Sequence, residues 1–70
     1  MSYHHYYVND NAQANGDHEV HKDTCTFFHL MKNRTYLGYF SKCEDAVKKA
    51  RERHAKVNGC CHCSLPCHTT

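Results

Sequence analysis

The sequence has no Trp, one Pro and three Gly among its 70 residues, and its large aliphatic residues are few. No apolar run approaches the roughly 20 residues that a membrane-spanning helix needs. A chain of this length buries only about 60% of the surface that it exposes when unfolded, so a core formed from these residues is marginal. These shortages exclude a multidomain enzyme, a membrane protein and an enzyme with a large buried active site.

What the sequence does contain is six Cys and eight His. Small scaffolds with thin cores usually need disulfides or a bound metal to stay folded. Residues 1–10 have no apolar core typical of a secretion signal, so we expect a cytoplasmic protein. Because cytosolic thiols stay reduced, a metal site is favoured over a disulfide framework. The disulfide framework and a set of unliganded thiols remain the alternatives.

The spacing of apolar and aromatic residues predicts a small α+β fold with a three-stranded antiparallel sheet, one packed helix and a C-terminal Cys-rich knuckle. The chain is expected to form a single domain over residues 1–70, in which residues 60–70 form the Cys/His-rich tail, and fraying of residues 1–5 is the alternative to a first strand there. Three segments favour β-structure, and the last two are expected to pair as a hairpin. These segments are residues 3–8, 18–24 and 33–40.

Strict alternation in the third strand would place Tyr36 and Tyr39 on opposite faces of the sheet. The helix is expected to begin with Ser41 as its N-cap and Glu44 as the reciprocal capping residue. Its apolar face recurs at helical spacing, and Asn58-Gly59 supplies a left-handed stop. The face consists of Cys43, Ala46, Val47, Ala50, His54 and Val57.

The tail holds the pattern Cys60-x2-Cys63, followed by Cys67 and His68. Two thiolates separated by two residues can both reach one tetrahedral Zn²⁺. A helix that runs back along the hairpin would return the tail to Cys25. The predicted ligands of a structural Zn²⁺ are therefore Cys25, Cys60, Cys63 and Cys67, with His68 as the substitute.

The other cysteines have simpler interpretations. Cys43 lies on the apolar helix face, where a free Cys packs as a small hydrophobic residue. Cys61 and His62 are left outside the ligand set, although which four groups bind stays open. Cys60-x2-Cys63 also has the spacing of a redox motif, but it follows the end of a helix, where the dipole disfavours a thiolate. A thioredoxin-like activity is therefore not expected.

His18-Glu19-Val20-His21 is one residue shorter than the H-E-x-x-H motif of zinc proteases, and it lies in a predicted strand. His18 and His21 would then face opposite sides, which excludes that activity. Glu19, His21 and Cys25 share one side of the strand. We expect Glu19 and His21 to form part of a solvated polar face.

Six of the nine basic residues lie on the predicted helix, as in some nucleic-acid-binding domains. The formal charge is +2, however, and four thiolates with one Zn²⁺ would bring it to about zero. A monomeric, non-enzymatic structural or protein-interaction module is therefore favoured over a nucleic-acid binder, and a thiol-redox or metal-handling role is a further alternative. Exposed tyrosines could serve base stacking or a protein interface. These are Tyr3, Tyr6, Tyr7 and Tyr39.

Three motifs together resemble a family of small bacterial Cys/His-rich proteins that has no established activity. They are Asn15-Gly-Asp-His-Glu-Val-His21, Tyr36-Leu-Gly-Tyr-Phe40 with Cys43, and Asn58-Gly-Cys60 with Cys63 and Cys67-His-Thr69. The resemblance implies a bacterial source and one compact domain. The step Phe40-Ser41-Lys42 into the helix is also similar to YegP-like β-β-β-α domains, which implies a sheet covered by one helix.

Overall fold

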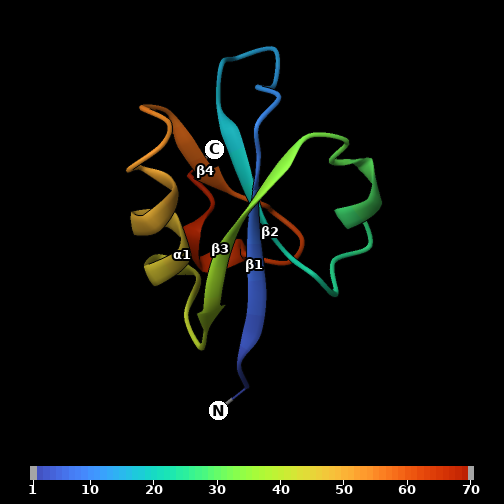
Figure 1. The fold of residues 1–70 in the computed structure, drawn as a ribbon, viewed down its shortest axis with the longest axis vertical. Coiled ribbons are helices and arrows are strands. Elements are labelled where there is room, and N and C mark those ends of the chain that lie inside the picture. Colours follow the sequence, from blue (N-terminus) through green and yellow to red (C-terminus); the bar gives the residue numbers. More distant parts are fainter. Residues whose placement is uncertain (1, 70) are drawn as a thin grey trace.

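The computed structural model describes residues 2–69 and contains one helix, α1, packed against a four-stranded sheet (Figure 1). Two short 3₁₀ turns, η1 and η2, lie in the connections. The bounds are β1 His4–Asn9, β2 His18–Lys22, η1 Phe28–Leu30, β3 Arg34–Phe40, α1 Cys43–Ala50, β4 Val57–Gly59 and η2 Leu65–Cys67. The expected α+β class is therefore observed, and His4 and His5 begin β1, in agreement with the strand predicted at residues 3–8 and not with its fraying alternative.

The strand order β3-β1-β2-β4 corrects the predicted hairpin. β2 and β3 do not pair with each other, because β1 lies between them and is antiparallel to both. β4 joins the other side of β2 in parallel, with Val20 opposite Gly59. The sheet is therefore mixed and has four strands, where three antiparallel strands were predicted.

A β-bulge interrupts the pairing of β3 with β1. Tyr6 lies opposite Gly38 and Tyr7 lies opposite Tyr36, so Leu37 is an extra residue between them. Gly38 has φ +140°, a conformation that side chains other than glycine rarely adopt. The extra residue reverses the alternation along β3, and Tyr36 and Tyr39 consequently share one face of the sheet, contrary to the prediction.

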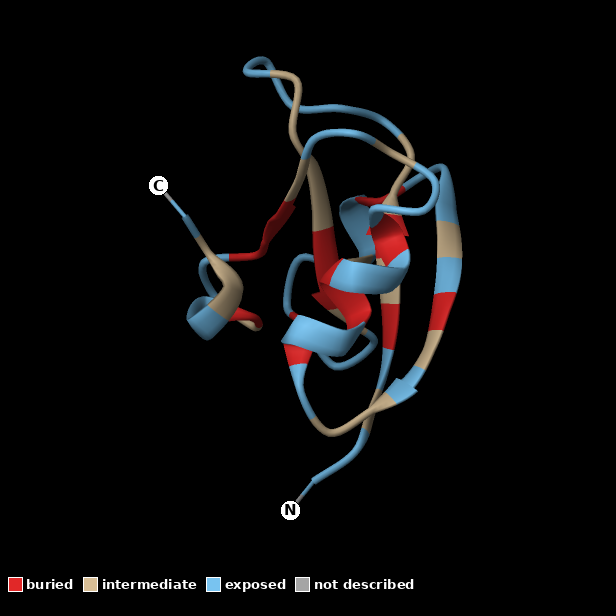
Figure 2. Cartoon of the chain, turned by 90° about the vertical axis from the view of Figure 1, so that its left-hand side faces the viewer, coloured by how far each residue is buried: buried red, intermediate tan, exposed pale blue. Residues whose placement is uncertain are grey.

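The core lies between α1 and one face of the sheet (Figure 2). Tyr6, Val8 and Val20 extend from the sheet and are at most 1% exposed, which places Tyr6 inside and corrects its expected exposure. The helix contributes the first four residues of its predicted apolar face, whereas His54 and Val57 lie beyond its end. The buried helical residues are Cys43, Ala46, Val47 and Ala50.

The two ends of α1 differ from their predictions. Lys42 occupies the N-cap position and no side chain caps the helix, so the Ser41–Glu44 box does not form. The helix ends after Ala50, and Val57-Asn58-Gly59 forms β4 instead of a helical stop. Backbone pairing with β2, beginning with the bond from His18 N–H to the Lys56 carbonyl, replaces the last helical turns. No helix within residues 2–69 is long and apolar enough to cross a bilayer.

Asp10 connects the end of β1 to β3 and to the segment after α1. Its carboxylate accepts hydrogen bonds from Thr35 Oγ1 at 2.6 Å, His54 Nε2 at 2.8 Å and Arg53 Nε at 3.0 Å. Burial by itself would raise the pKa of Asp10, but these three donors outweigh it and lower the pKa to about 2. The ring of His54 also stacks on His18, with centroids 3.7 Å apart. The lowered pKa means that the folded protein stabilises the charged Asp10 carboxylate more than its protonated form.

Replacing Asp10 by Asn should lower the free energy of unfolding by about 1 kcal/mol at pH 7, because charge-assisted hydrogen bonds are lost at a partly exposed site. A lowered pKa means that this stabilisation is present above the ordinary pKa of Asp and is lost only as the pH falls through about 2. Urea denaturation of the wild type and the variant should therefore show a constant difference between pH 7 and pH 5. Asp23→Asn, at an exposed turn, is the control; an equal effect there, or a difference that vanishes by pH 5, would contradict this role.

Candidate metal centre

Four potential metal ligands converge where β2 ends. His21 is near the end of β2, and Cys25 follows the turn in which its N–H bonds to the Lys22 carbonyl. Parallel pairing with β2 brings the end of β4 beside His21, and Cys60 is the next residue. The turn closed by Ser64 N–H and the Cys60 carbonyl then returns Cys63 to the same point. Three separate parts of the chain thus supply the cluster of His21, Cys25, Cys60 and Cys63.

The donor atoms of this cluster all lie within 4.8 Å of one another. Cys25 Sγ is 3.6 Å from His21 Nδ1 and 3.9 Å from Cys60 Sγ, and Cys63 Sγ is 3.9 Å from His21 Nδ1. In a tetrahedron with Zn–S bonds of about 2.3 Å and a Zn–N bond of about 2.0 Å, neighbouring donors are separated by about 3.5–3.8 Å. These three separations are close to tetrahedral values, and the four groups together could hold a metal ion.

Burial controls the protonation of these groups. His21, Cys25 and Cys60 are buried, and Cys63 is half-buried. Burial lowers the pKa of His21, despite the opposing effect of Glu19, and keeps the imidazole neutral and able to donate its lone pair. Burial raises the pKa of the Cys60 and Cys63 thiols. A metal would have to displace these protons, so metal affinity is expected to fall as the pH is lowered.

Groups around the cluster orient its donors. Glu19 Oε1 lies 3.3 Å from His21 Nε2, which leaves Nδ1 facing the sulfur atoms. The backbone N–H of Lys22 donates to Cys63 Sγ at 3.3 Å, and that of His62 donates to Cys60 Sγ at 3.4 Å. Hydrogen bonds to sulfur favour the thiolate, and a carboxylate behind a histidine is a common arrangement at metal sites.

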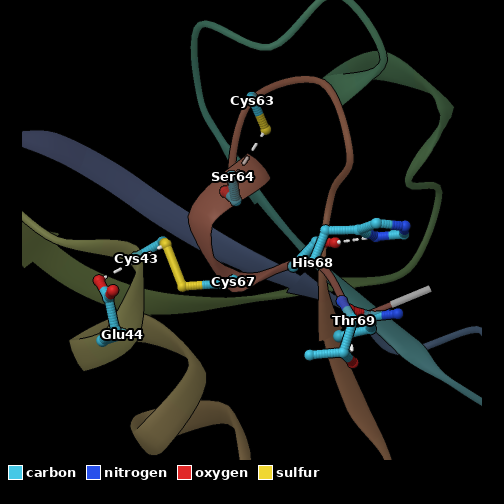
Figure 3. Close-up of a disulfide and its surroundings, with 9 residues drawn as sticks. Cys43, Glu44, Cys63, Ser64, Cys67, His68 and Thr69 are labelled. Atoms are coloured by element: carbon cyan, nitrogen blue, oxygen red, sulfur yellow. Dashed lines mark hydrogen bonds between the residues drawn. A yellow bond between two sulfur atoms is a disulfide. The ribbon is translucent and has the colours of Figure 1, made fainter.

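The structure corrects the predicted role of Cys67. Its sulfur forms a disulfide with Cys43, so Cys67 has no free thiolate for the cluster (Figure 3). Cys43 is buried on the apolar helix face as predicted, but it is not a free thiol. The geometric reason is that η2 carries Cys67 past the cluster to the first turn of α1. Cys43, Glu44 and Cys67 also lie close together, but their two sulfur atoms are already bonded to each other.

His68 is also outside the cluster. Its Nδ1 lies 3.0 Å from the Gly59 carbonyl oxygen, to which it donates (Figure 3). The next residue, Thr69, donates its N–H to the side chain of buried Asn58. Both bonds attach the end of the tail to β4. His68 therefore has a backbone partner where a metal-ligand role was expected.

Gly59 allows the tail to close against β4. A Cβ atom at this position would lie 2.6 Å from Cys67 Cβ and 2.8 Å from the Ser64 carbonyl oxygen. These distances are too short for any side chain, so the residue before Cys60 must be glycine for the tail to follow its path. The Asn58-Gly59 pair thus serves strand pairing and close packing.

Sequence reasoning placed Cys25, Cys60 and Cys63 in the ligand set, and the structure brings these three together. Sequence reasoning missed His21, which was expected on a solvated face but is only 4% exposed. The available signal was alternation, because His21 and Cys25 share one side of the strand. Cys61 is exposed and His62 packs its ring 4.6 Å from Phe27, and neither belongs to the cluster.

No protein-family model, curated protein or solved structure matches this chain. The resemblances to small bacterial Cys/His-rich proteins and to YegP-like domains therefore remain predictions. What can be said of the centre depends on its own geometry.

Glu19→Gln should weaken metal binding about 10- to 100-fold, because the amide cannot replace the negative charge that supports His21. Competition with a chromophoric zinc chelator at pH 7 would measure the change in affinity. Asp17→Asn, which alters an acid on the turn before β2, should leave the affinity nearly unchanged. Equal affinities for Glu19→Gln and the wild type would contradict the supporting role of Glu19.

Proposed function

We propose that this protein is a non-enzymatic module whose fold is fixed by one Zn²⁺ bound to His21, Cys25, Cys60 and Cys63. The observation that carries the proposal is the convergence of four buried or half-buried donor atoms from three chain segments to within 4.8 Å of one another, with three of their separations at 3.6–3.9 Å. A cytoplasmic bacterial protein acting as a monomer with a protein partner is the setting that the sequence favours.

The donor set favours zinc over other ions. Three sulfurs and one imidazole nitrogen form a soft set, which suits zinc and disfavours magnesium or calcium. Three thiolates and Zn²⁺ would together carry a net charge of −1, and the N–H groups of Lys22 and His62 face that charge. Hydrogen bonding thus compensates for part of the burial of a charged centre.

The site favours a structural role over a catalytic one. Catalytic zinc usually has three protein ligands and an open position for water, whereas structural zinc has four. Here four side chains would complete the tetrahedron. Because the ligands lie far apart in the sequence, a bound ion would tie the turn after β2 to the chain after β4.

Energy magnitudes support the same interpretation. Structural Zn²⁺ contributes roughly 10–16 kcal/mol of apparent folding energy in small domains. The Cys43–Cys67 disulfide spans 24 positions, for which loop-closure entropy gives about 3.5 kcal/mol. The total stability of a domain of this kind is about 5–15 kcal/mol. The metal would therefore decide whether the chain folds, and the disulfide would change the free energy of unfolding by a smaller amount.

Cys60→Ser and Cys63→Ser should each abolish tight zinc binding and leave the chain largely unfolded at 25 °C. Cys61→Ser is the matched control, because Cys61 is an exposed neighbour outside the cluster and should leave zinc content and folding unchanged. Circular dichroism together with native mass spectrometry would follow both properties. If Cys60→Ser and Cys63→Ser fold like the wild type without metal, the structural-zinc proposal is wrong.

Native mass spectrometry also tests the composition of the folded chain directly. One zinc ion that replaces two protons adds about 63 Da and one disulfide removes about 2 Da, so the folded chain should be about 61 Da heavier than the reduced, metal-free chain. A folded chain about 4 Da lighter than the reduced chain would instead contain two disulfides and no metal.

A disulfide-stapled protein of the same fold is the second candidate function, and the Cys43–Cys67 bond favours it. Such bonds are typical of oxidising compartments, which is an argument against a cytoplasmic location. Cys25 and Cys60, with sulfurs 3.9 Å apart, would be the second pair after a small movement.

Cys43→Ser combined with Cys67→Ser should lower the free energy of unfolding of the zinc-loaded protein by about 3 kcal/mol without loss of metal, because only loop closure is relaxed. Chemical denaturation at a fixed free zinc concentration would measure it. Complete unfolding of this double variant with zinc present would favour the disulfide-stapled alternative.

A further inference from the structure

The face of the sheet opposite α1 carries a continuous ladder of aromatic rings over β1 and β3. Neighbouring ring centroids are 4.6–5.7 Å apart along the whole series. The Tyr36 hydroxyl also lies 2.8 Å from His5 Nδ1. In order along the sheet, the ladder consists of Tyr3, Tyr39, His5, Tyr36, Tyr7 and Phe28.

The ladder is open to solvent over most of its length. Tyr3, Tyr36 and Tyr39 are 50–56% exposed, His5 is exposed, and Tyr7 is half-buried. α1 packs against the opposite face of the sheet, which carries the core, so among residues 2–69 it lies away from these rings. Exposed aromatic rings that form one contiguous series, unlike apolar residues scattered singly over a surface, mark an interaction site.

The bulge at Leu37 and Gly38 creates this face. Without the extra residue, Tyr36 and Tyr39 would lie on opposite sides of β3. With it, Tyr36 is opposite Tyr7 and Tyr39 is opposite His5 on the neighbouring strand. The ladder follows β1 from Tyr3 to Tyr7, a distance of about 13 Å, comparable with the two or three bases that aromatic residues stack on other four-stranded sheets.

A positive charge lies at one end of the ladder. The Arg34 guanidinium is 4.5 Å from the Phe28 ring centroid and 5.8 Å from that of Tyr7. It donates to the Met31 carbonyl, and no carboxylate within residues 2–69 forms an ion pair with it. Lys32 is exposed and also lacks an ion pair among the described residues. The acids of the β2 segment, Glu19 and Asp23, are separated from β3 by β1.

We propose that this aromatic ladder binds single-stranded nucleic acid, with bases stacked on Tyr36 and Tyr39 and a phosphate at Arg34. Flat π-surfaces and an unpaired cation together match a ligand that alternates bases with anionic groups. A duplex would not bind in this way, because its bases are already stacked on one another. Recognition would be tolerant of sequence, since every base offers a π-face.

The ladder is connected to the candidate metal centre, and this connection rests on the proposed function. Tyr7 is the cross-strand neighbour of His21, and Phe28 belongs to the segment that begins at Cys25. A metal ion on Cys25 would therefore hold Phe28 against Tyr7 and complete one end of the ladder. Loss of metal should weaken nucleic-acid binding as well as folding.

Fluorescence anisotropy with the zinc-loaded full chain tests the proposal, using labelled eight-nucleotide oligo(dT) and oligo(U) at 50 and 200 mM KCl. The wild type should bind both, and an unlabelled duplex of equal length should compete poorly. Tyr36→Ala should weaken binding about 5- to 100-fold, because one stacking surface is lost. Tyr36→Phe keeps the ring and should stay within about twofold of the wild type.

Two variants that each remove one positive charge distinguish binding at the ladder from nonspecific electrostatic attraction of the nucleic acid. Arg34→Gln should weaken binding and reduce the salt dependence by about one unit of slope. Lys49→Gln removes an exposed cation of α1 and should have little effect, because α1 lies on the other side of the sheet. Equal losses in these two variants, with none in Tyr36→Ala, would overturn the proposal in favour of nonspecific charge attraction.

The remaining outcomes keep the two proposals distinguishable. A wild type that carries zinc but binds neither oligonucleotide overturns the ladder proposal alone. A metal-free wild type that binds oligonucleotides through Tyr36 overturns the zinc proposal alone. If Tyr36→Ala converts a dimer to a monomer in sedimentation and no oligonucleotide binds, the ladder is instead a contact between two copies of the chain.

Discussion

The meeting of three chain segments at the end of β2 is the constraint on which the C-terminal part of this molecule depends. Parallel pairing of β4 with β2 places Cys60 beside His21, and the following turn returns Cys63 to the same place. Residues 60–69 have little apolar material of their own, so the hydrophobic effect alone gives them little reason to stay near the sheet. Hydrogen bonds and the bonds made by sulfur atoms must therefore hold these residues against the sheet.

The cysteines of the tail attach it at two places, in addition to the hydrogen bonds of His68 and Thr69 to β4. One is the sulfur and imidazole cluster near Cys60 and Cys63, and the other is the disulfide from Cys67 to the first turn of α1. Gly59 makes both compatible, because only a residue without a side chain lets β4 and η2 approach so closely. The tail thus contacts the helix through Cys67 and the sheet on both sides of that residue. A domain with a thin core gains rigidity from such distributed attachments.

The two faces of the sheet differ in composition and in role. One face carries Tyr6, Val8 and Val20 against α1 and accounts for the core. The other carries the aromatic ladder and His21, so the proposed binding surface and the candidate metal centre share it. The bulge at Gly38 is the local feature that keeps Leu37 in the core and yet aligns Tyr36 with Tyr39. One unusual backbone conformation therefore serves both faces.

The sequence by itself determined the α+β class, the three longer strands, most of the apolar face of α1 and the grouping of Cys60 with Cys63, because these follow from local periodicity and short spacings. The prediction that Cys25 joins them rested on a hairpin of β2 and β3 that does not form, and the parallel pairing of β4 with β2 brings these cysteines together instead. Only the tertiary structure decided that β1 separates β2 from β3, that residues 57–59 pair as a strand, and that Cys67 bonds to Cys43. It also brought His21 into the cluster and moved Tyr36 beside Tyr39. Each of these depends on which distant segments lie side by side, or on a single inserted residue in a strand. Alternation and propensity describe a segment alone, and they carry no information on its neighbours across the sheet.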